Sequence, residues 1–441
     1  MNLIYGIKDK PKFAQMLLFA LQQVLAILAA TIAVPAIVGN GMSASAALFG
    51  AGVGTIVYQL FTKFRSPVFL GSSFTFIGPM LAAFSGGVTV GYLGLVLGAI
   101  FAGLVYVIIA LVVKFAGVKW IDKVMPPAVI GPTVALIGLS LAGAAVNDVF
   151  SYGEKTTFGI SSYFIMNSAT WASLICALVT LLVVVITSTY GKKMIKLIPF
   201  IIGILAGYLA GVIFTLCGIP VVDFSLFQDM KIFAIPEFTF TKAIQGIGEF
   251  KPAYLATVAV AYIPVAFVVF AEHLADHKNL SSIIGQDLTK EPGLHRTLLG
   301  DGIGSIAGAI FGGCPNTTYG ESVGCVSITR NASVITITTA AIMCLVISFF
   351  GPFVAFLDSI PGCVMGGVCV TLYGFIACSG LKMIQKVDLN QNKNLFTVAT
   401  ILIPGIGGMA LGIGEVYITT TACALILGII VNALLSKAKE E

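Results

Sequence analysis

Charged residues are scarce in this chain of 441 residues: they make up 10% of it, whereas hydrophobic residues make up 58%. A soluble globular protein has roughly 25% charged residues. The 19 acidic and 24 basic side chains are too few to solvate the surface of a soluble chain of this size. The same scarcity excludes intrinsic disorder, because disordered segments are polar. Together with a mean hydropathy of +1.03, the composition predicts a polytopic membrane protein.

Metal and redox motifs are missing as well. The nine cysteines include no Cys-X-X-Cys pair, so neither a disulfide framework nor a zinc site is suggested. The only three histidines lie between residues 273 and 295 and offer no metal cluster or nucleophile–base pair for a membrane-embedded enzyme. No cleavable signal peptide is expected, since the chain runs polar to Gln15 without a small-residue cleavage site. The sequence therefore predicts neither an enzyme nor a bound cofactor.

Long apolar runs, in contrast, are abundant. A membrane helix needs about 20 mostly apolar residues. Eleven stretches approach or exceed this length: 16–38, 43–61, 89–113, 126–146, 167–187, 197–217, 252–274, 331–351, 360–380, 395–413 and 416–435. Three further apolar segments, 76–86, 297–313 and 320–329, are short or rich in glycine. Counted as short or broken helices, they bring the prediction to fourteen transmembrane segments.

Basic residues gather in the loops on one side of this arrangement. They precede the first span, follow the second, fourth, sixth, eighth and twelfth, and close the chain: Lys8, Lys10, Lys12, Lys63, Arg65, Lys114, Lys119, Lys123, Lys192, Lys193, Lys196, Lys278, Lys290, Arg296, Lys382, Lys386, Lys393, Lys437 and Lys439. Cytoplasmic loops are enriched in Lys and Arg. Both termini are therefore predicted to lie in the cytoplasm.

Two interrupted segments suggest an internal repeat, which must be inverted if each half has seven spans. Residues 67–76 (Pro-Val-Phe-Leu-Gly-Ser-Ser-Phe-Thr-Phe) and 314–321 (Cys-Pro-Asn-Thr-Thr-Tyr-Gly-Glu) both contain two hydroxyl residues followed by an aromatic. Such residues are poor helix formers and plausible strand formers. Paired interruptions in the two halves point to a transporter binding site. Ordinary re-entrant loops or turns outside the membrane are the alternative.

Three carboxylates lie where a membrane protein rarely places charge. Glu272 ends an uncharged run over residues 252–271, Asp276 follows one turn later on the same helix face, and Glu321 comes directly after the second interrupted segment. A charged side chain at the bilayer centre costs at least about 2.5–3.5 kcal/mol, so such residues usually line a polar site. The alternative is that Glu272 ends a helix in solvent and that Asp276 and the histidines begin a cytoplasmic loop.

Residues 321–330, Glu-Ser-Val-Gly-Cys-Val-Ser-Ile-Thr-Arg, resemble the signature of the nucleobase/ascorbate transporter family. That signature reads Gln/Glu/Pro, Asn, any residue, Gly, four of any kind, Thr, then Arg/Lys/Gly, and only Ser322 departs from it. Other segments are similar to the uracil–xanthine permease branch, so that the resemblance covers nearly the whole chain: 70–74, 271–273, 292–296, 315–321 and, less specifically, 364–368 and 372–374.

The resemblance implies an all-α polytopic membrane protein of fourteen transmembrane segments in two inverted seven-segment repeats. Two short half-membrane β-strands would lie at the substrate site. Residues 1–125 and 252–352 would form a core domain (spans 1–4 and 8–11), and residues 126–251 and 353–441 a gate domain (spans 5–7 and 12–14). Such a protein would span the inner or plasma membrane of a bacterium.

The same resemblance implies import of a nucleobase, with uracil as the first choice, by proton symport and alternating access. Na⁺ remains open as the coupling ion. The implied substrate-binding residues are Glu272, Glu321, Phe74, Tyr319, Gly320, Ala30 and Ser73. The glutamates would bond the ring N–H groups, the two aromatic residues would flank the ring, and backbone N–H groups near Phe74 and Gly320 would meet its carbonyl oxygens. Proton coupling would fall to Glu272, Asp276 and Glu321.

The implied partners are a small-molecule nucleobase and the lipid bilayer. A homodimer remains open as the assembly, and no nucleic acid is expected.

Two departures bear on the substrate. Uracil permeases typically have His where this chain has Asp276, which is the residue of purine-transporting relatives, and Gln22-Gln23 stands where many members have Gln-His. Glu321 favours the pyrimidine branch, because the purine branch usually has Gln there. Xanthine or uric acid is therefore the second choice.

Two other function classes compete. An anion transporter of the sulfate-permease type would share the architecture, but a carboxylate at a half-helix start would repel an anion, and those proteins usually carry a soluble carboxy-terminal domain. A signalling receptor would need a sizeable soluble output module, which the sequence does not suggest.

Overall fold

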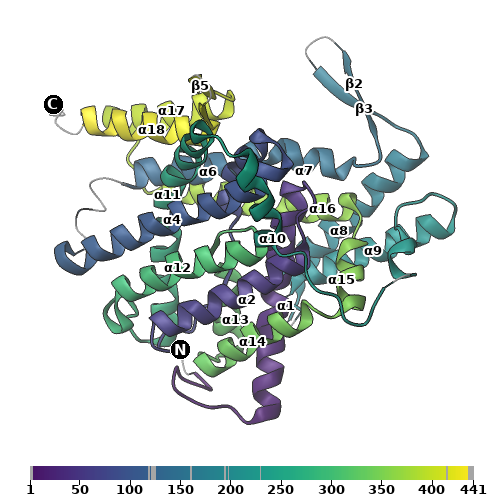
Figure 1. Ribbon diagram of the computed structural model, residues 1–441, viewed down its shortest axis with the longest axis horizontal. Helices are drawn as coiled ribbons and strands as arrows, with labels where there is room; N and C mark the ends of the chain where they lie inside the picture. The colour runs from purple at the N-terminus through teal and green to yellow at the C-terminus, as the bar shows by residue number, and fades with distance from the viewer. Residues whose placement is uncertain are drawn as a thin grey trace. The chain divides into compact units, whose positions relative to one another are not determined.

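The computed structural model describes residues 3–435 except 118–119, 121–125, 159–160, 193–194, 197, 229 and 414–415. The basic positions Lys119, Lys123, Lys193, Lys437 and Lys439 lie outside the described residues. The described chain is mostly helical, with three two-stranded antiparallel sheets (Figure 1). Eight of the described helices are long and apolar enough to cross a membrane.

The chain forms two compact units, each assembled from segments that are distant in the sequence. The first unit comprises Met1–Ser140, Pro236–Leu345 and Ile376–Glu441, and the second comprises Leu141–Ile235 and Val346–Phe375. The division into core and gate domains at residues 125, 251 and 352 remains a prediction.

The first unit contains most of the described helices and two short strand pairs. Its helices are α1 (Phe13–Val38), α2 (Ala44–Phe61), α3 (Ile77–Ala83), α4 (Val88–Ala116), α6 (Pro127–Ser140), α10 (Thr239–Gln245), α11 (Pro252–Ile284), α12 (Leu294–Gly312), α13 (Gly320–Thr329), most of α14 (Val334–Ile347), α17 (Asn392–Ile406) and α18 (Thr420–Leu434). Its strands are β1 (Leu70–Ser72), β4 (Asn316–Thr318), β5 (Leu411–Ile413) and β6 (Val416–Ile418). Short helical turns are η1 (Phe74–Phe76), η2 (Phe84–Gly86), η4 (Gly246–Glu249) and η5 (Thr289–Gly293).

The second unit is smaller. Its elements are α7 (Ala142–Val149), β2 (Glu154–Phe158), β3 (Ser161–Ile165), α8 (Ser168–Tyr190), α9 (Pro199–Leu216), η3 (Phe224–Phe227), α15 (Gly351–Asp358) and the part of α16 (Gly362–Ile384) up to Phe375. Strands β2 and β3 form an antiparallel hairpin. Glycines on α9 allow close packing on α8, where a Cβ on Gly203 would meet the Val184 side chain.

Several spans differ in length from those expected. The segment expected at 297–313 as short or broken is one continuous helix, α12, of 19 residues. Helix α11 has 33 residues and runs ten residues past the expected end at 274. The spans expected at 331–351, 395–413 and 416–435 correspond to the shorter helices α14, α17 and α18, of which α17 begins three residues before the expected start. Hydropathy locates these segments but does not set where each helix stops.

Helices α2 and α12 cross closely through glycines. A Cβ on Gly50 would meet the Gly308 carbonyl oxygen, and one on Gly304 would meet that of Gly54. Small residues at this spacing let two helix backbones touch. The Asn316 side chain, next to this crossing, donates a hydrogen bond to the Gly50 carbonyl oxygen at 3.0 Å. The crossing therefore also anchors β4 to α2.

Strands β1 and β4 pair antiparallel, with Leu70 opposite Thr318 and Gly71 opposite Thr317. The pair is buried over its whole length, and the Ser73 N–H extends it by donating to the Pro315 carbonyl oxygen at 2.9 Å. The Thr55 hydroxyl on α2 completes the free edge of Leu70, whose N–H donates to it at 2.9 Å. The two interrupted segments of the sequence thus meet each other in space.

Candidate functional site

The β1–β4 pair is the centre of the candidate site, because each strand leads directly into a short helix. Strand β1 is followed by η1 and α3, and β4 is followed by α13. The Tyr319 hydroxyl donates to the Ser72 carbonyl oxygen at 2.6 Å. The Tyr319 ring lies so close over Gly71 that a Cβ there would collide with it. Glycine at position 71 is therefore required by the aromatic residue on the opposite strand.

Glu272 on α11 is held against the segment that follows β1. The Thr75 hydroxyl lies 3.0 Å from Glu272 Oε1 and 3.2 Å from Oε2, and it donates its single proton to this carboxylate. The Glu272 side chain is partly exposed, while Thr75 is buried. One oxygen of the carboxylate therefore stays available for a second donor.

Asp276 is held in the same way by the other strand. The Thr318 hydroxyl donates to Asp276 Oδ2 at 2.7 Å. Gly320 is the exposed first residue of α13, and a Cβ on it would lie 4.0 Å from Asp276 Oδ1. The two acids of α11, one turn apart, thus contact different segments: Glu272 bonds Thr75 in η1, after β1, and Asp276 bonds Thr318 in β4.

Glu321 lies in the first turn of α13, a helix of 10 residues. The N-terminus of a helix favours negative charge. Its neighbour Ser322 is 1% exposed, and the buried hydroxyls of Ser73 and Ser322 have no hydrogen-bond partner within the described ranges. The Gln23 amide donates to the Ser322 carbonyl oxygen at 3.5 Å. This end of α13 therefore presents a carboxylate next to a residue, Ser322, whose hydroxyl is unused within the described ranges.

The remaining expected positions lie around the same strands. Phe74 begins η1 and is partly exposed, whereas Tyr319 is only 4% exposed. Ala30 is buried in α1, the helix that packs on β1 and α13. Every residue that the sequence put forward therefore lies on or beside the β1–β4 pair, in the first unit. Which of them touch a substrate remains a prediction.

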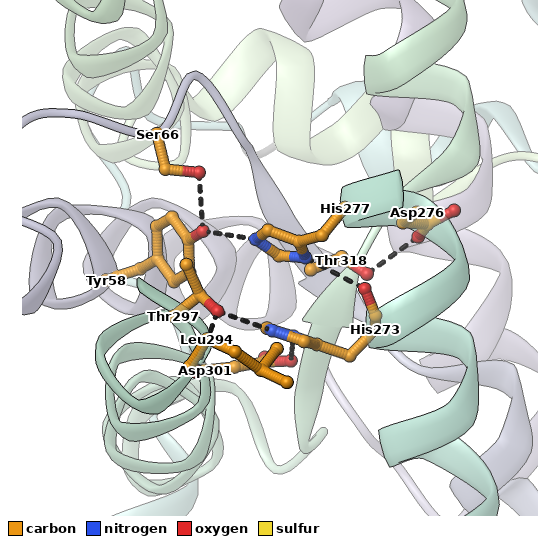
Figure 2. A network of polar contacts seen from close by, with 9 residues as sticks. All are labelled: Tyr58, Ser66, His273, Asp276, His277, Leu294, Thr297, Asp301 and Thr318. Carbon is orange, nitrogen blue, oxygen red and sulfur yellow. Dashed lines mark hydrogen bonds and ion pairs between the residues drawn. The ribbon is translucent and has the colours of Figure 1, made fainter. Parts of the chain in front are cut away.

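A second polar network is built on His273 and His277, which lie on either side of Asp276 in the sequence of α11 (Figure 2). His277 Nδ1 lies 2.8 Å from the His273 carbonyl oxygen, which can only accept. In neutral His277 this nitrogen carries the proton, so Nε2 accepts from the Tyr58 hydroxyl at 2.7 Å. Tyr58 in turn accepts from Ser66 at 2.7 Å. The chain of bonds ties α11 to α2 and to the segment before β1.

His273 is bonded at both ring nitrogens. The Thr297 hydroxyl donates to the Leu294 carbonyl oxygen at 3.0 Å, so at His273 Nε2, also 3.0 Å away, it must accept. Nε2 therefore carries a proton. His273 Nδ1 lies 2.6 Å from Asp301 Oδ2, with both side chains buried. One further proton bridges these two atoms, so the pair as a whole has no net charge.

This network corrects one expectation. The alternative in which Asp276 and the histidines begin a cytoplasmic loop is wrong, because α11 continues to Ile284 and both His273 and His277 are fully buried.

Three polar residues of the site were not singled out from the sequence. Thr75 and Thr318 lie within the two hydroxyl-containing segments, but nothing in the sequence indicates that each would bond an acid of α11. Asp301 is the one acid within the glycine-rich segment 297–313. The criterion applied to Glu272, an acid inside an apolar stretch, would have found it.

Comparison with known proteins identifies the family. A family model described as a permease family matches residues 14–413. The chain belongs to this permease family. It is similar to the uracil permease of Bacillus subtilis (strain 168), with 39% identity over 99% of this chain and 96% of that protein. It is also similar to the uracil permease of Escherichia coli (strain K12), with 33% identity over 96% of this chain and 92% of that protein.

These relatives confirm the resemblance to the uracil–xanthine permease branch that the sequence motifs indicated. They are named permeases rather than enzymes, so the chain is a multi-pass membrane transport protein, and the expectation that it is not an enzyme is confirmed.

Solved structures give the fold class. The transmembrane domain of a cyanobacterial bicarbonate transporter matches with a TM-score of 0.64 and 15% identity, over 96% of this chain and 98% of that chain. The murine solute carrier 26 family member A9 anion transporter, in its inward-facing state, also gives a TM-score of 0.64, with 13% identity over 97% of this chain and 69% of that chain. At such low identity the likeness shows a shared transporter fold and nothing about the substrate.

Proposed function

We propose that this permease imports uracil by proton symport, with the nucleobase bound between β1 and β4. The observation that carries the proposal is the arrangement of Glu272, Asp276 and Glu321 around this strand pair. The full-length similarity to bacterial uracil permeases supports the choice of substrate. Carboxylates around a strand pair suit a small planar ligand with alternating donors and acceptors.

The chemistry of uracil matches the groups that the site offers. Its edge alternates ring N–H donors with C=O acceptors. The carboxylates of Glu272 and Glu321 would accept from the ring N–H groups, and backbone N–H groups near Phe74 and Gly320 would donate to the carbonyl oxygens. Phe74 and Tyr319 would flank the ring, while Ala30 and Ser73 would complete its surroundings. A ligand without these groups would leave buried polar atoms unpaired, which gives specificity.

Proton coupling would use the carboxyl groups of Glu272, Asp276 and Glu321, with no other cofactor. One charge moved through about 100 mV gains about 2.3 kcal/mol, and one pH unit adds about 1.4 kcal/mol. One proton per uracil would thus sustain roughly 500-fold accumulation. Na⁺ is the alternative coupling ion.

For the transport cycle, we propose fourteen spans in two inverted seven-segment repeats, with β1 and β4 as half-membrane strands. A core domain (residues 1–125 and 252–352) would move past a gate domain (residues 126–251 and 353–441) in an elevator-type alternating access. The lengths and positions of the apolar helices and the fold shared with solved transporters support this arrangement. The protein would lie in the bacterial inner membrane, alone or as a homodimer.

Asp276 favours a second candidate, xanthine or uric acid, because purine-transporting relatives have Asp at this position. Transport of an anion such as sulfate is disfavoured, since three carboxylates around the strand pair would repel it.

Uptake of radiolabelled uracil by cells that express the full chain tests the function. We expect uptake that excess unlabelled uracil abolishes, that xanthine reduces less, and that sulfate leaves unchanged. A protonophore should collapse accumulation. Uptake that survives the protonophore but requires Na⁺ would reverse the choice of ion, and absence of saturable uracil uptake would refute the function.

The proposed orientation can be tested by labelling. Single cysteines in place of Lys10 and Lys386, both in predicted cytoplasmic segments, should react with a membrane-impermeant maleimide only after the membrane is opened. A cysteine at Thr156 on the β2–β3 hairpin serves as the control, since that loop is predicted to lie outside. Labelling of either lysine position in intact cells would contradict the proposed orientation.

Asp276→Asn tests the proton role of this residue. The amide can still accept the Thr318 hydrogen bond but cannot take up or release a proton. We therefore expect a weaker pH dependence of uptake, while equilibrium uracil binding is reduced less than in Glu321→Ala. Uptake is to be measured from pH 5 to 8 and binding by calorimetry. An unchanged pH profile would remove Asp276 from the coupling mechanism.

A further inference from the structure

A second polar pocket lies at the other end of α11, within the first unit. It has a volume of about 280 Å³ and is lined by Ser85, Glu249, Lys251, Tyr254, Thr257 and Tyr417, among others. Thr257 precedes Glu272 by 15 residues on α11, which is about 22 Å at a rise of about 1.5 Å per residue. The pocket is therefore distinct from the β1–β4 site and connected to it by one helix.

Two walls of this pocket are fixed by hydrogen bonds. The Tyr254 hydroxyl donates to the Ala83 carbonyl oxygen, and the Val90 carbonyl oxygen lies 3.3 Å away. The Tyr417 N–H on β6 donates to the Thr257 hydroxyl at 3.1 Å. The Tyr254 ring and the backbone of Tyr417 are thus each fixed by a neighbouring residue without a ligand.

The two charged residues of the pocket are available for a ligand. Neither Glu249 nor Lys251 is among the ion pairs found within the described part of the chain. Both side chains are exposed, so each can turn toward a ligand at little cost. Lys251 supplies N–H donors and Glu249 supplies acceptors, at a wall that also holds Tyr254 and Tyr417.

We infer that this pocket is an outer binding site for the nucleobase, occupied before it reaches the β1–β4 site; the inference rests on the proposed function. Lys251 donates to a ring carbonyl oxygen, Glu249 accepts from a ring N–H, and Tyr417 provides an aromatic surface. The volume lies just below the range of about 300–1,000 Å³ that drug-sized ligands occupy, so it suits a smaller ligand. Glu249 disfavours a simple anion, which Lys251 alone would attract.

The place of the pocket fits a role in entry. It lies at the N-terminal end of α11, whereas the basic residues Lys278 and Lys290 lie at or beyond the other end. In the proposed orientation it faces the outside, where uracil arrives.

Saturation-transfer NMR with uracil on the purified full chain tests this site, because the method detects weak binding. In the Glu272→Ala/Glu321→Ala background both proposed ring acceptors of the β1–β4 site are absent, so the uracil signal that remains should come from the outer pocket. Adding Lys251→Met and Tyr417→Ala should remove most of that signal. The matched control adds Lys155→Met and Tyr163→Ala instead, on the β2–β3 hairpin outside the pocket, and should leave it unchanged.

In an otherwise unaltered chain, the pocket substitutions should raise the KM for uracil uptake roughly 3- to 10-fold, the effect of one or two exposed hydrogen bonds. Calorimetric affinity at the β1–β4 site should stay the same. Loss of the signal in the double-alanine background, or equal signals in the pocket and control variants, would overturn the outer site and leave the proposed function standing. Absence of any uracil signal in the unaltered chain would overturn both.

Discussion

Glu321→Ala should lower the affinity of the purified chain for uracil by roughly 10- to 150-fold. The reason is that a ring N–H would lose the charged acceptor that the proposed site provides. A hydrogen bond to a charged group is worth about 1.5–3 kcal/mol, and about 1.4 kcal/mol corresponds to tenfold in affinity. Glu321 lies in the first turn of α13, beside the β1–β4 pair, so truncation removes a group of the site and not of the apolar core. Isothermal calorimetry measures the change.

Two further variants make the result interpretable. Glu321→Gln keeps an acceptor oxygen without the charge, so its loss of affinity should be smaller than that of alanine. Glu154→Ala, on the exposed β2–β3 hairpin, removes a carboxylate away from the strand pair and should bind like the unaltered chain. Near-native affinity of Glu321→Ala would show that this carboxylate does not meet the substrate. The unfolding temperature of each variant separates lost binding from lost structure.

The sequence predicts the membrane helices well where the signal is local. Apolar length alone places α2, α4 and α8 to within a few residues of the expected spans 43–61, 89–113 and 167–187. It fails where tertiary contacts decide. Helix α12 was expected as a short or broken segment because of its glycines, yet these glycines are the surface on which α2 packs. Composition records that a residue is a poor helix former in isolation, but not that a neighbouring helix requires it.

The site shows the same division. The extended character of the segments 67–76 and 314–321 follows from their hydroxyl and aromatic residues. The pairing of β1 with β4 does not, since it joins parts of the chain that are distant in sequence. Helical spacing places Glu272 and Asp276 on one face of α11. Only the structure shows that Thr75 holds the first and Thr318 the second. Long-range hydrogen bonds leave no periodic trace in a single sequence.

Asp301→Ala should lower the free energy of unfolding by about 1–3 kcal/mol or more, because about 1–3 kcal/mol is the usual cost of leaving a buried polar group unpaired. Asp301 is 1% exposed and lies 2.6 Å from His273 Nδ1, through which α12 is joined to α11. Alanine leaves that ring nitrogen without a partner and opens a gap in the interior. Thermal unfolding of the purified chain in detergent measures the loss.

Asp301→Asn is the matched control. Because Thr297 already donates to Leu294, neutral His273 keeps its proton on Nε2 and has a free acceptor at Nδ1. The asparagine amide can donate to that atom, so most of the stability should remain. Leucine at both His273 and Asp301 removes both polar partners, and replacing a buried pair by apolar residues is often close to neutral.

The double-leucine variant should therefore lose much less stability than the sum of the two single leucine variants, which each leave one polar group unpaired. This non-additivity is the signature of two buried polar groups that satisfy each other. If the two losses simply add, or if asparagine at 301 destabilises the chain as much as alanine, then His273 and Asp301 act as separate core residues. The geometry of Thr297 would then not determine where the protons lie.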